Sequence, residues 1–188
     1  MDAWPLDEFH IDNELLARVL TADDAASVFE VVRRNEHHLM EFMHWMVPDY
    51  SLQMAEEFIE ATRKSIENKE HLGFGIFRRD RLLGVIGFVS FDWKARKTEI
   101  GYWIDKDEQG KGIISRASRY LIDYAFDGLD LNRIEIRCSS ENLRSAAIPK
   151  RLGFRFEGHL RQSEFRNGKL HDFLTFGLLR SDRKPAEN

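Results

Sequence analysis

Residues 82–91 (Leu-Leu-Gly-Val-Ile-Gly-Phe-Val-Ser-Phe) are apolar almost throughout, without regular alternation of polar residues. A strand with one face in solvent alternates apolar and polar side chains, whereas a strand buried on both faces is continuously apolar. The polar turn Arg79-Asp80-Arg81 separates this run from a second apolar segment, residues 72–77, as in two neighbouring strands. The chain is therefore expected to form a sheet that is covered on both faces.

Helical and strand periodicity surrounds this pair of strands. Thr21-Ala22-Asp23-Asp24 resembles a capping box, so a helix is expected to begin near Ala22, and Ser51 is a candidate N-cap of a second helix. Further helices are predicted for residues 113–126 and 142–152, and further strands for residues 98–105, 133–139, 154–165 and 170–179. The last two strands flank Asn167-Gly168, a dipeptide typical of hairpin turns. This order predicts an α+β fold with a mixed, mostly antiparallel sheet flanked by helices.

Length and composition limit the classes of protein that the chain can belong to. Its 188 residues suffice for one domain, expected over residues 1–180, with a polar, flexible tail over residues 181–188. A net charge of −4 argues against nucleic-acid binding. The apolar runs are too short to span a bilayer, the first residues do not resemble a signal peptide, and the single cysteine, Cys138, rules out an internal disulfide. These features predict a cytoplasmic protein that does not associate with membranes.

The most informative segment for function is the strand at residues 98–105, the glycine-rich turn after it and the helix that begins near Ile113. Gly110 and Gly112 allow the backbone to approach a ligand closely, and the helix N-terminus offers free N–H groups. Together they favour an anion site, most naturally for a pyrophosphate. The spacing fits neither a Rossmann fingerprint, which needs Gly or Ala where Ser115 stands, nor a Walker loop, which needs Ser or Thr after Gly110-Lys111.

Three motifs, in order along the chain, resemble the GNAT acetyltransferases. They are Gln109-Gly110-Lys111-Gly112-Ile113, then Asn142-Leu143-Arg144-Ser145 with Arg151-Leu152-Gly153-Phe154, and finally residues 162–168, which are similar to the hairpin of the RimJ/RimL-like subgroup. The resemblance implies the GNAT acyl-CoA N-acyltransferase fold, acetyl-CoA as cosubstrate and, for this subgroup, a protein N-terminus of the ribosomal-protein type as acceptor. It also implies that the following residues bind the cosubstrate: Ile104, Gln109, Gly110, Lys111, Gly112, Ile113, Ile114 and Asn142.

The same resemblance nominates two residues for catalysis. Many members place a tyrosine acid in the short helix, but here that position is Pro149, which has no proton to give. Ser145, one helical turn earlier, is the candidate that protonates or stabilises the departing thiolate, and Glu164 is the candidate base. The plainer interpretations are a helix-cap contact for Ser145 and a solvated strand carboxylate for Glu164. The strand at residues 98–105 supplies N–H donors for the oxyanion if it splays from its neighbour.

Other interpretations remain open at the level of sequence. The acceptor is alternatively a small amine, such as a polyamine or an aminoglycoside, and a further alternative is a CoA-binding sensor without turnover. No metal is expected: His37, Glu41 and His44 share a helical face without further ligands, and Cys138 is expected to be a buried thiol. The apolar residues between positions 40 and 46 belong either to the core or to the acceptor pocket. A homodimer is expected from the subgroup, without a predicted interface.

Overall fold

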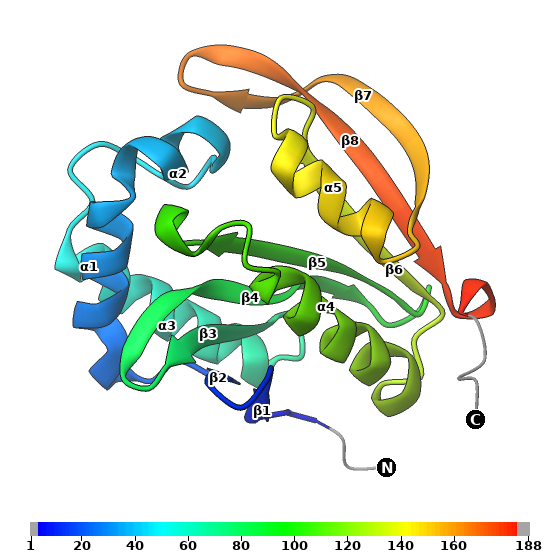
Figure 1. Ribbon diagram of the computed structural model, residues 1–188, viewed down its shortest axis with the longest axis horizontal. Coiled ribbons are helices and arrows are strands. Elements are labelled where there is room, and N and C mark those ends of the chain that lie inside the picture. Colours follow the sequence, from blue (N-terminus) through cyan, green and yellow to red (C-terminus); the bar gives the residue numbers. More distant parts are fainter. Residues whose placement is uncertain (1–3, 184–188) are drawn as a thin grey trace.

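The computed structural model describes residues 4–183 and contains one twisted sheet with helices on both faces (Figure 1). Eight strands lie in the order β1-β2-β3-β4-β5-β6-β8-β7, and of these neighbouring pairs only β5 and β6 run parallel. The strands are β1 (Glu8–His10), β2 (Leu15–Arg18), β3 (Leu72–Arg78), β4 (Arg81–Asp92), β5 (Lys97–Ile104), β6 (Arg133–Ser139), β7 (Arg155–Arg166) and β8 (Lys169–Leu179). The predicted α+β fold with a mixed, mostly antiparallel sheet is confirmed.

The helices form two groups on the two faces of the sheet. They are α1 (Ala25–Arg34), α2 (Glu36–Phe42), α3 (Leu52–Glu67), α4 (Ile113–Asp123) and α5 (Leu143–Arg151), with a π-helical turn, η3 (Tyr124–Gly128), directly after α4. Ile86 and Phe88 of β4 belong to the core that α4 completes, whereas Leu82 and Val85 belong to the cluster formed with α1 and α3. The apolar segment at residues 82–91 is therefore a central strand covered on both sides, as predicted.

Local signals explain where the first helices begin. Asp24, at the end of the 3₁₀ turn η1 (Ala22–Asp24), accepts a hydrogen bond from the Thr21 N–H at 2.8 Å, which completes the capping box ahead of α1. Ser51 caps α3 by accepting from the Met54 N–H at 3.3 Å. Both predicted starts are confirmed.

The parallel pair β5–β6 opens soon after it begins. The two strands are paired only from Lys97 to Glu99 on β5, so the rest of β5 has no hydrogen-bonded neighbour on that side within the described chain. Figure 1 shows β6, β8 and β7 turning away from β5, with α5 beside the opening. The sheet thus provides the splayed strand that the proposed chemistry needs.

The sequence analysis did not predict β1 and β2, which are only three and four residues long. At the other end, the tail was predicted from residue 181, but Arg180–Asp182 forms a 3₁₀ turn, η4, and Arg183 forms ion pairs with Asp123 and Asp127. These contacts hold residues 181–183 of the expected tail against the domain, and residues 184–188 lie outside the described residues. No helix in the described part of the chain is long and apolar enough to cross a membrane.

Candidate active site

A cavity of about 640 Å³ lies where β5 and β6 separate. Its wall is formed by the end of β5, the turn after it, the first residues of α4, the facing side of α5 and residues of α2. The cavity therefore joins three segments that are far apart in the sequence.

Most of the residues predicted to act on the cosubstrate line this cavity. They are Ser145 and seven of the eight predicted binding residues: Ile104, Gln109, Gly110, Gly112, Ile113, Ile114 and Asn142. Lys111 does not line it; its Nζ instead lies 3.1 Å from a carboxylate oxygen of Glu108. Lys111 thus supports the turn from behind.

The turn between β5 and α4 adopts the conformation expected of an anion-binding loop. Gly110 and Gly112 have φ of +76° and +72°, in the left-handed region that favours glycine, and Gly112 is the N-cap of α4. The first N–H groups of α4 have no partners within the helix and point out of its N-terminus. The geometry suits a pyrophosphate, which needs several converging N–H donors.

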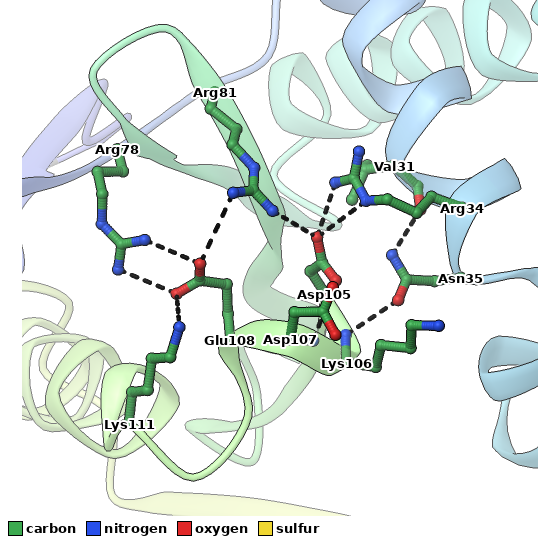
Figure 2. A network of polar contacts seen from close by, with 10 residues as sticks. All are labelled: Val31, Arg34, Asn35, Arg78, Arg81, Asp105, Lys106, Asp107, Glu108 and Lys111. Carbon is green, nitrogen blue, oxygen red and sulfur yellow. Dashed lines mark hydrogen bonds and ion pairs between the residues drawn. The ribbon is translucent and has the colours of Figure 1, made fainter.

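Two buried carboxylates hold this turn in place (Figure 2). The Asp105 side chain has no exposed surface; its Oδ2 accepts from Nη2 of Arg34 at 2.7 Å and from Nη2 of Arg81 at 3.0 Å. Glu108, also buried, accepts two hydrogen bonds from Arg78, at 2.8 and 3.0 Å. The turn is therefore tied both to α1 and to the β3–β4 hairpin.

The pKa values of these carboxyl groups reflect the network. Burial alone would raise the pKa of Asp105, but hydrogen bonds from Arg34, the Asp107 N–H and Arg81 outweigh it and lower that pKa. The hydrogen bonds from Arg78 are the main reason why the pKa of Glu108 is lowered. Both groups are therefore ionised at neutral pH, and the network is a set of charge-assisted hydrogen bonds.

The edge of β5 that faces the cavity offers backbone donors. The N–H of Asp105 donates to the Leu83 carbonyl at 2.7 Å, on the β4 side. Successive residues of a strand direct their N–H groups to opposite edges, so the N–H of Ile104 points toward the edge that β6 leaves open. An extended ligand can pair with this edge as an added strand would.

A hydrogen-bonded chain crosses one side of the cavity. Nη1 of Arg144 on α5 donates to Oε1 of Gln109 at 2.6 Å, and Nε2 of Gln109 lies 2.5 Å from Nε2 of His38 on α2. Since the Arg144 contact fixes the orientation of the Gln109 amide, Nε2 of Gln109 is the donor and His38 is neutral. Burial is the main reason why the pKa of His38 is lowered, which favours the same protonation state.

Ser145 combines the two roles considered from the sequence. Its N–H donates to the Asn142 side chain at 3.0 Å, so it takes part in the cap of α5. Ser145 lines the cavity, and its hydroxyl lies 3.2 Å from the hydroxyl of Tyr102, a residue of β5 that the sequence analysis did not single out.

Glu164 does not line the cavity. Its carboxylate forms an ion pair with Arg166, and its Oε1 lies 3.5 Å from Nδ1 of His44, in the segment after α2. Glu164 is therefore not a free, solvated strand residue, because its side chain is only 16% exposed.

The remaining candidates have structural explanations. Within residues 4–183 no three potential metal-ligating side chains come together, so His37, Glu41 and His44 form no metal site there. Cys138 is buried, and burial raises the pKa of its thiol. Within the apolar segment at residues 40–46, Met46 is buried in the core, whereas Phe42 and Met43 line the cavity.

A comparison with known protein families identifies the family of this chain. The family described as the acetyltransferase (GNAT) domain matches residues 14–155. The chain belongs to this family. It is an acetyl-CoA-dependent N-acetyltransferase, and the cavity with its anion-binding turn fits that cosubstrate.

Three known proteins illustrate the range of this GNAT chain's relatives. The ribosomal-protein-serine acetyltransferase of Escherichia coli (strain K12) is 31% identical over 169 residues, covering 86% of this chain and 90% of the relative. The spermidine N(1)-acetyltransferase of Vibrio cholerae is 24% identical over 172 residues, covering 91% and 96%. The microcin C7 self-immunity acetyltransferase MccE, solved with acetyl-CoA and AMP, has a TM-score of 0.86 and 26% identity, covering 90% and 94%.

The turn provides a first test of cosubstrate binding. Replacing Gly112 with Val should weaken acetyl-CoA binding by about tenfold. A β-branched residue in the left-handed region is strained by about 1–2 kcal/mol and its Cβ would lie 3.0 Å from Arg116, so the free turn would relax to another conformation and binding would have to restore the strained one. Gly168→Val is the matched control, since Gly168 has a φ of +74° in the β7–β8 turn. Titration calorimetry that finds equal affinities for the two variants would refute this placement of the pyrophosphate.

Proposed function

We propose that this GNAT enzyme transfers the acetyl group of acetyl-CoA to the N-terminal α-amine of a protein, of the ribosomal-protein type. The cavity at the β5–β6 opening is the observation that carries the proposal, because it joins an anion-binding turn, a free strand edge and the Ser145 hydroxyl. The relationship to the ribosomal-protein-serine acetyltransferase, over most of both chains, supports the choice of acceptor.

The donor half of the site follows from the turn and the strand edge. Backbone N–H groups of residues 109–114 bind the pyrophosphate, and Ile104 pairs with the pantetheine amides. Asn142 contacts the pantetheine arm from the α5 side. This arrangement directs the thioester toward Ser145.

The chemical step needs a base for the amine and a hydrogen-bond donor for the departing thiolate. The amine loses a proton and its lone pair forms a bond to the thioester carbon; the carbon–sulfur bond then breaks and its electron pair remains on sulfur. Glu164 takes the amine proton through a water molecule, since its side chain does not line the cavity, and the Ser145 hydroxyl stabilises the thiolate by donating a hydrogen bond to it. Free N–H groups on the open edge of β5 stabilise the oxyanion.

A second acceptor class has an observation in its favour. The chain is related to a spermidine N(1)-acetyltransferase over most of its length, and a small polyamine would also fit a cavity of about 640 Å³. A CoA-binding sensor without turnover is the third alternative and predicts binding without thiol release.

A panel of acceptors separates the three functions. Thiol release from acetyl-CoA is measured with a peptide bearing a free N-terminus, with the same peptide acetylated at its N-terminus, and with spermidine. We expect turnover with the first peptide alone, and mass spectrometry should place the acetyl group on its α-amine. Turnover with spermidine only would favour the second class, and binding of CoA without release would favour the sensor.

We also propose that the enzyme forms a homodimer through the β7–β8 hairpin. Phe156, Leu160, Phe165 and Leu170 are large apolar residues of this hairpin that are exposed, and β7 is an edge strand. Sedimentation should find a mass of two chains that falls on dilution; a mass of one chain at every concentration would contradict this proposal.

A further inference from the structure

Two hydroxyl groups, from β5 and α5, face each other at the cavity. The Ser145 hydroxyl donates to the Tyr102 hydroxyl at 3.2 Å, and the Tyr102 hydroxyl donates to the Ser145 carbonyl at 3.3 Å. Both residues line the cavity, so this pair lies at its wall.

Pro149 explains why the Ser145 carbonyl is available. In an α-helix this carbonyl would accept from the N–H of the residue four positions later, which is Pro149 in α5 and has no N–H. A partly buried carbonyl without a donor costs free energy, and the Tyr102 hydroxyl supplies the missing hydrogen bond. The proline therefore creates a docking point for a tyrosine that comes from another element.

We propose that Tyr102 is a positioning residue that orients the Ser145 hydroxyl toward the departing sulfur of CoA. This inference rests on the proposed role of Ser145. As negative charge develops on sulfur, the Ser145 O–H turns toward it, and the Tyr102 O–H turns from the Ser145 carbonyl to Oγ of Ser145. Each change is a rotation about one C–O bond, because hydroxyl hydrogens are free to choose their acceptor. No covalent bond is made or broken by Tyr102.

The surroundings of Tyr102 suit a donor rather than an acid. Burial is the main reason why the pKa of Tyr102 is raised, so the phenol keeps its proton at neutral pH. It would be a poor proton source for a thiolate, whose conjugate acid is much stronger, but it remains a hydrogen-bond donor. A hydrogen bond from Tyr102 to Ser145 also polarises the Ser145 hydroxyl, which makes it a stronger donor than it would be alone.

Kinetics of single and double variants test the inference. Tyr102→Phe should lower kcat by about three- to tenfold and leave the KM for acetyl-CoA unchanged, because one hydrogen bond to the developing charge is weakened. In a Ser145→Ala background the same replacement should have no further effect on kcat. Tyr120→Phe is the matched control, since Tyr120 is 39% exposed and stacks on Phe9; it should leave kcat unchanged.

A measurement without acceptor separates this inference from the proposed function. The ultraviolet absorbance of the thiolate reports the acidity of CoA bound to the enzyme, with the desulfo-CoA complex as the blank. Ser145→Ala and Tyr102→Phe should each lower the acid dissociation constant of the bound thiol, Tyr102→Phe by about three- to tenfold.

Three results would overturn the inference. If the bound CoA thiol is equally acidic in the wild type and in Tyr102→Phe but changes in Ser145→Ala, Tyr102 has no role in orienting the Ser145 hydroxyl. If the acidity of the bound thiol changes in neither variant, the proposed role of Ser145 is refuted as well. Additive losses of kcat in the double variant would mean that Tyr102 acts independently of Ser145. An enzyme that binds CoA but acetylates no amine would refute the proposed function, while the thiol titration would still decide the role of Tyr102.

Discussion

Replacing Asp105 with Asn should lower the free energy of unfolding by roughly 2–4 kcal/mol, since it removes a buried charge from three charge-assisted hydrogen bonds. The neutral amide keeps the shape of the side chain but leaves Arg34 and Arg81 without their carboxylate. Both arginines are 40% or more exposed and regain water, which limits the loss. Urea denaturation followed by circular dichroism measures the difference.

The control for Asp105 is an ion pair on the surface. Glu60 forms a pair with Lys64 on α3, and both side chains are about two-thirds exposed or more. Glu60→Gln should leave the stability unchanged within error, because exposed pairs contribute little. Equal stability of the wild type and Asp105→Asn would show that the arginines gain as much from water as from the carboxylate.

The same network predicts how stability depends on pH. The pKa of Asp105 is lower in the folded chain than in the unfolded chain, so its contribution is complete above the unfolded value, about 3.9, and is lost as the pH falls through the folded value. The stability of the wild type should therefore fall in acid more steeply than that of Asp105→Asn. If the free energies of unfolding of the two proteins fall in parallel below about pH 4, the folded pKa of Asp105 is not lowered.

Local patterns were sufficient to predict much of the fold. The continuous apolar run at residues 82–91 and the alternation at residues 98–105 depend on burial of each strand, and the structure confirms both as β4 and β5. The short strands β1 and β2 carry three and four residues, too few for a pattern to emerge. They form because β2 pairs with the free edge of β3, a contact between distant segments.

In the candidate site too, features set by the local sequence were predictable, whereas features that depend on contacts between distant segments were not. Gly110 and Gly112 are identified by their own chemistry, because only glycine adopts a positive φ without strain. Asp105 and Glu108 were not singled out from the sequence, since their partners Arg34 and Arg78 lie 71 and 30 positions away. The contact between Tyr102 and Ser145 spans 43 positions, and only the missing N–H of Pro149 hinted at an acceptor there.

The largest change in activity is expected at Glu164. Glu164→Gln should lower kcat by about 10²–10⁴-fold and leave the affinity for acetyl-CoA unchanged, because it removes the base and the residue does not line the cavity. Kinetics with the acceptor peptide and calorimetry with acetyl-CoA measure the two effects.

The structure shows that this variant also disturbs a buried cation. Arg166 is only 2% exposed and forms its ion pair with Glu164, while the carboxylate of Glu141 is 3.8 Å away. Glu164→Gln therefore leaves a buried charge poorly compensated, and some loss of stability is expected for that reason alone. A low kcat could then reflect a displaced hairpin instead of a missing base.

A double variant separates these two causes. Arg166→Met removes the buried cation, so Glu164→Gln with Arg166→Met should regain stability relative to Glu164→Gln, as seen in urea denaturation. If Glu164 is the base, kcat of the double variant stays 10²–10⁴-fold low, because no carboxylate accepts the amine proton. If Glu164 only neutralises Arg166, kcat recovers along with stability. Recovery of kcat would therefore mean that the amine loses its proton to water without a protein base. Glu164 would then be only the counter-ion of Arg166, which holds the β7–β8 hairpin against the segment after α2.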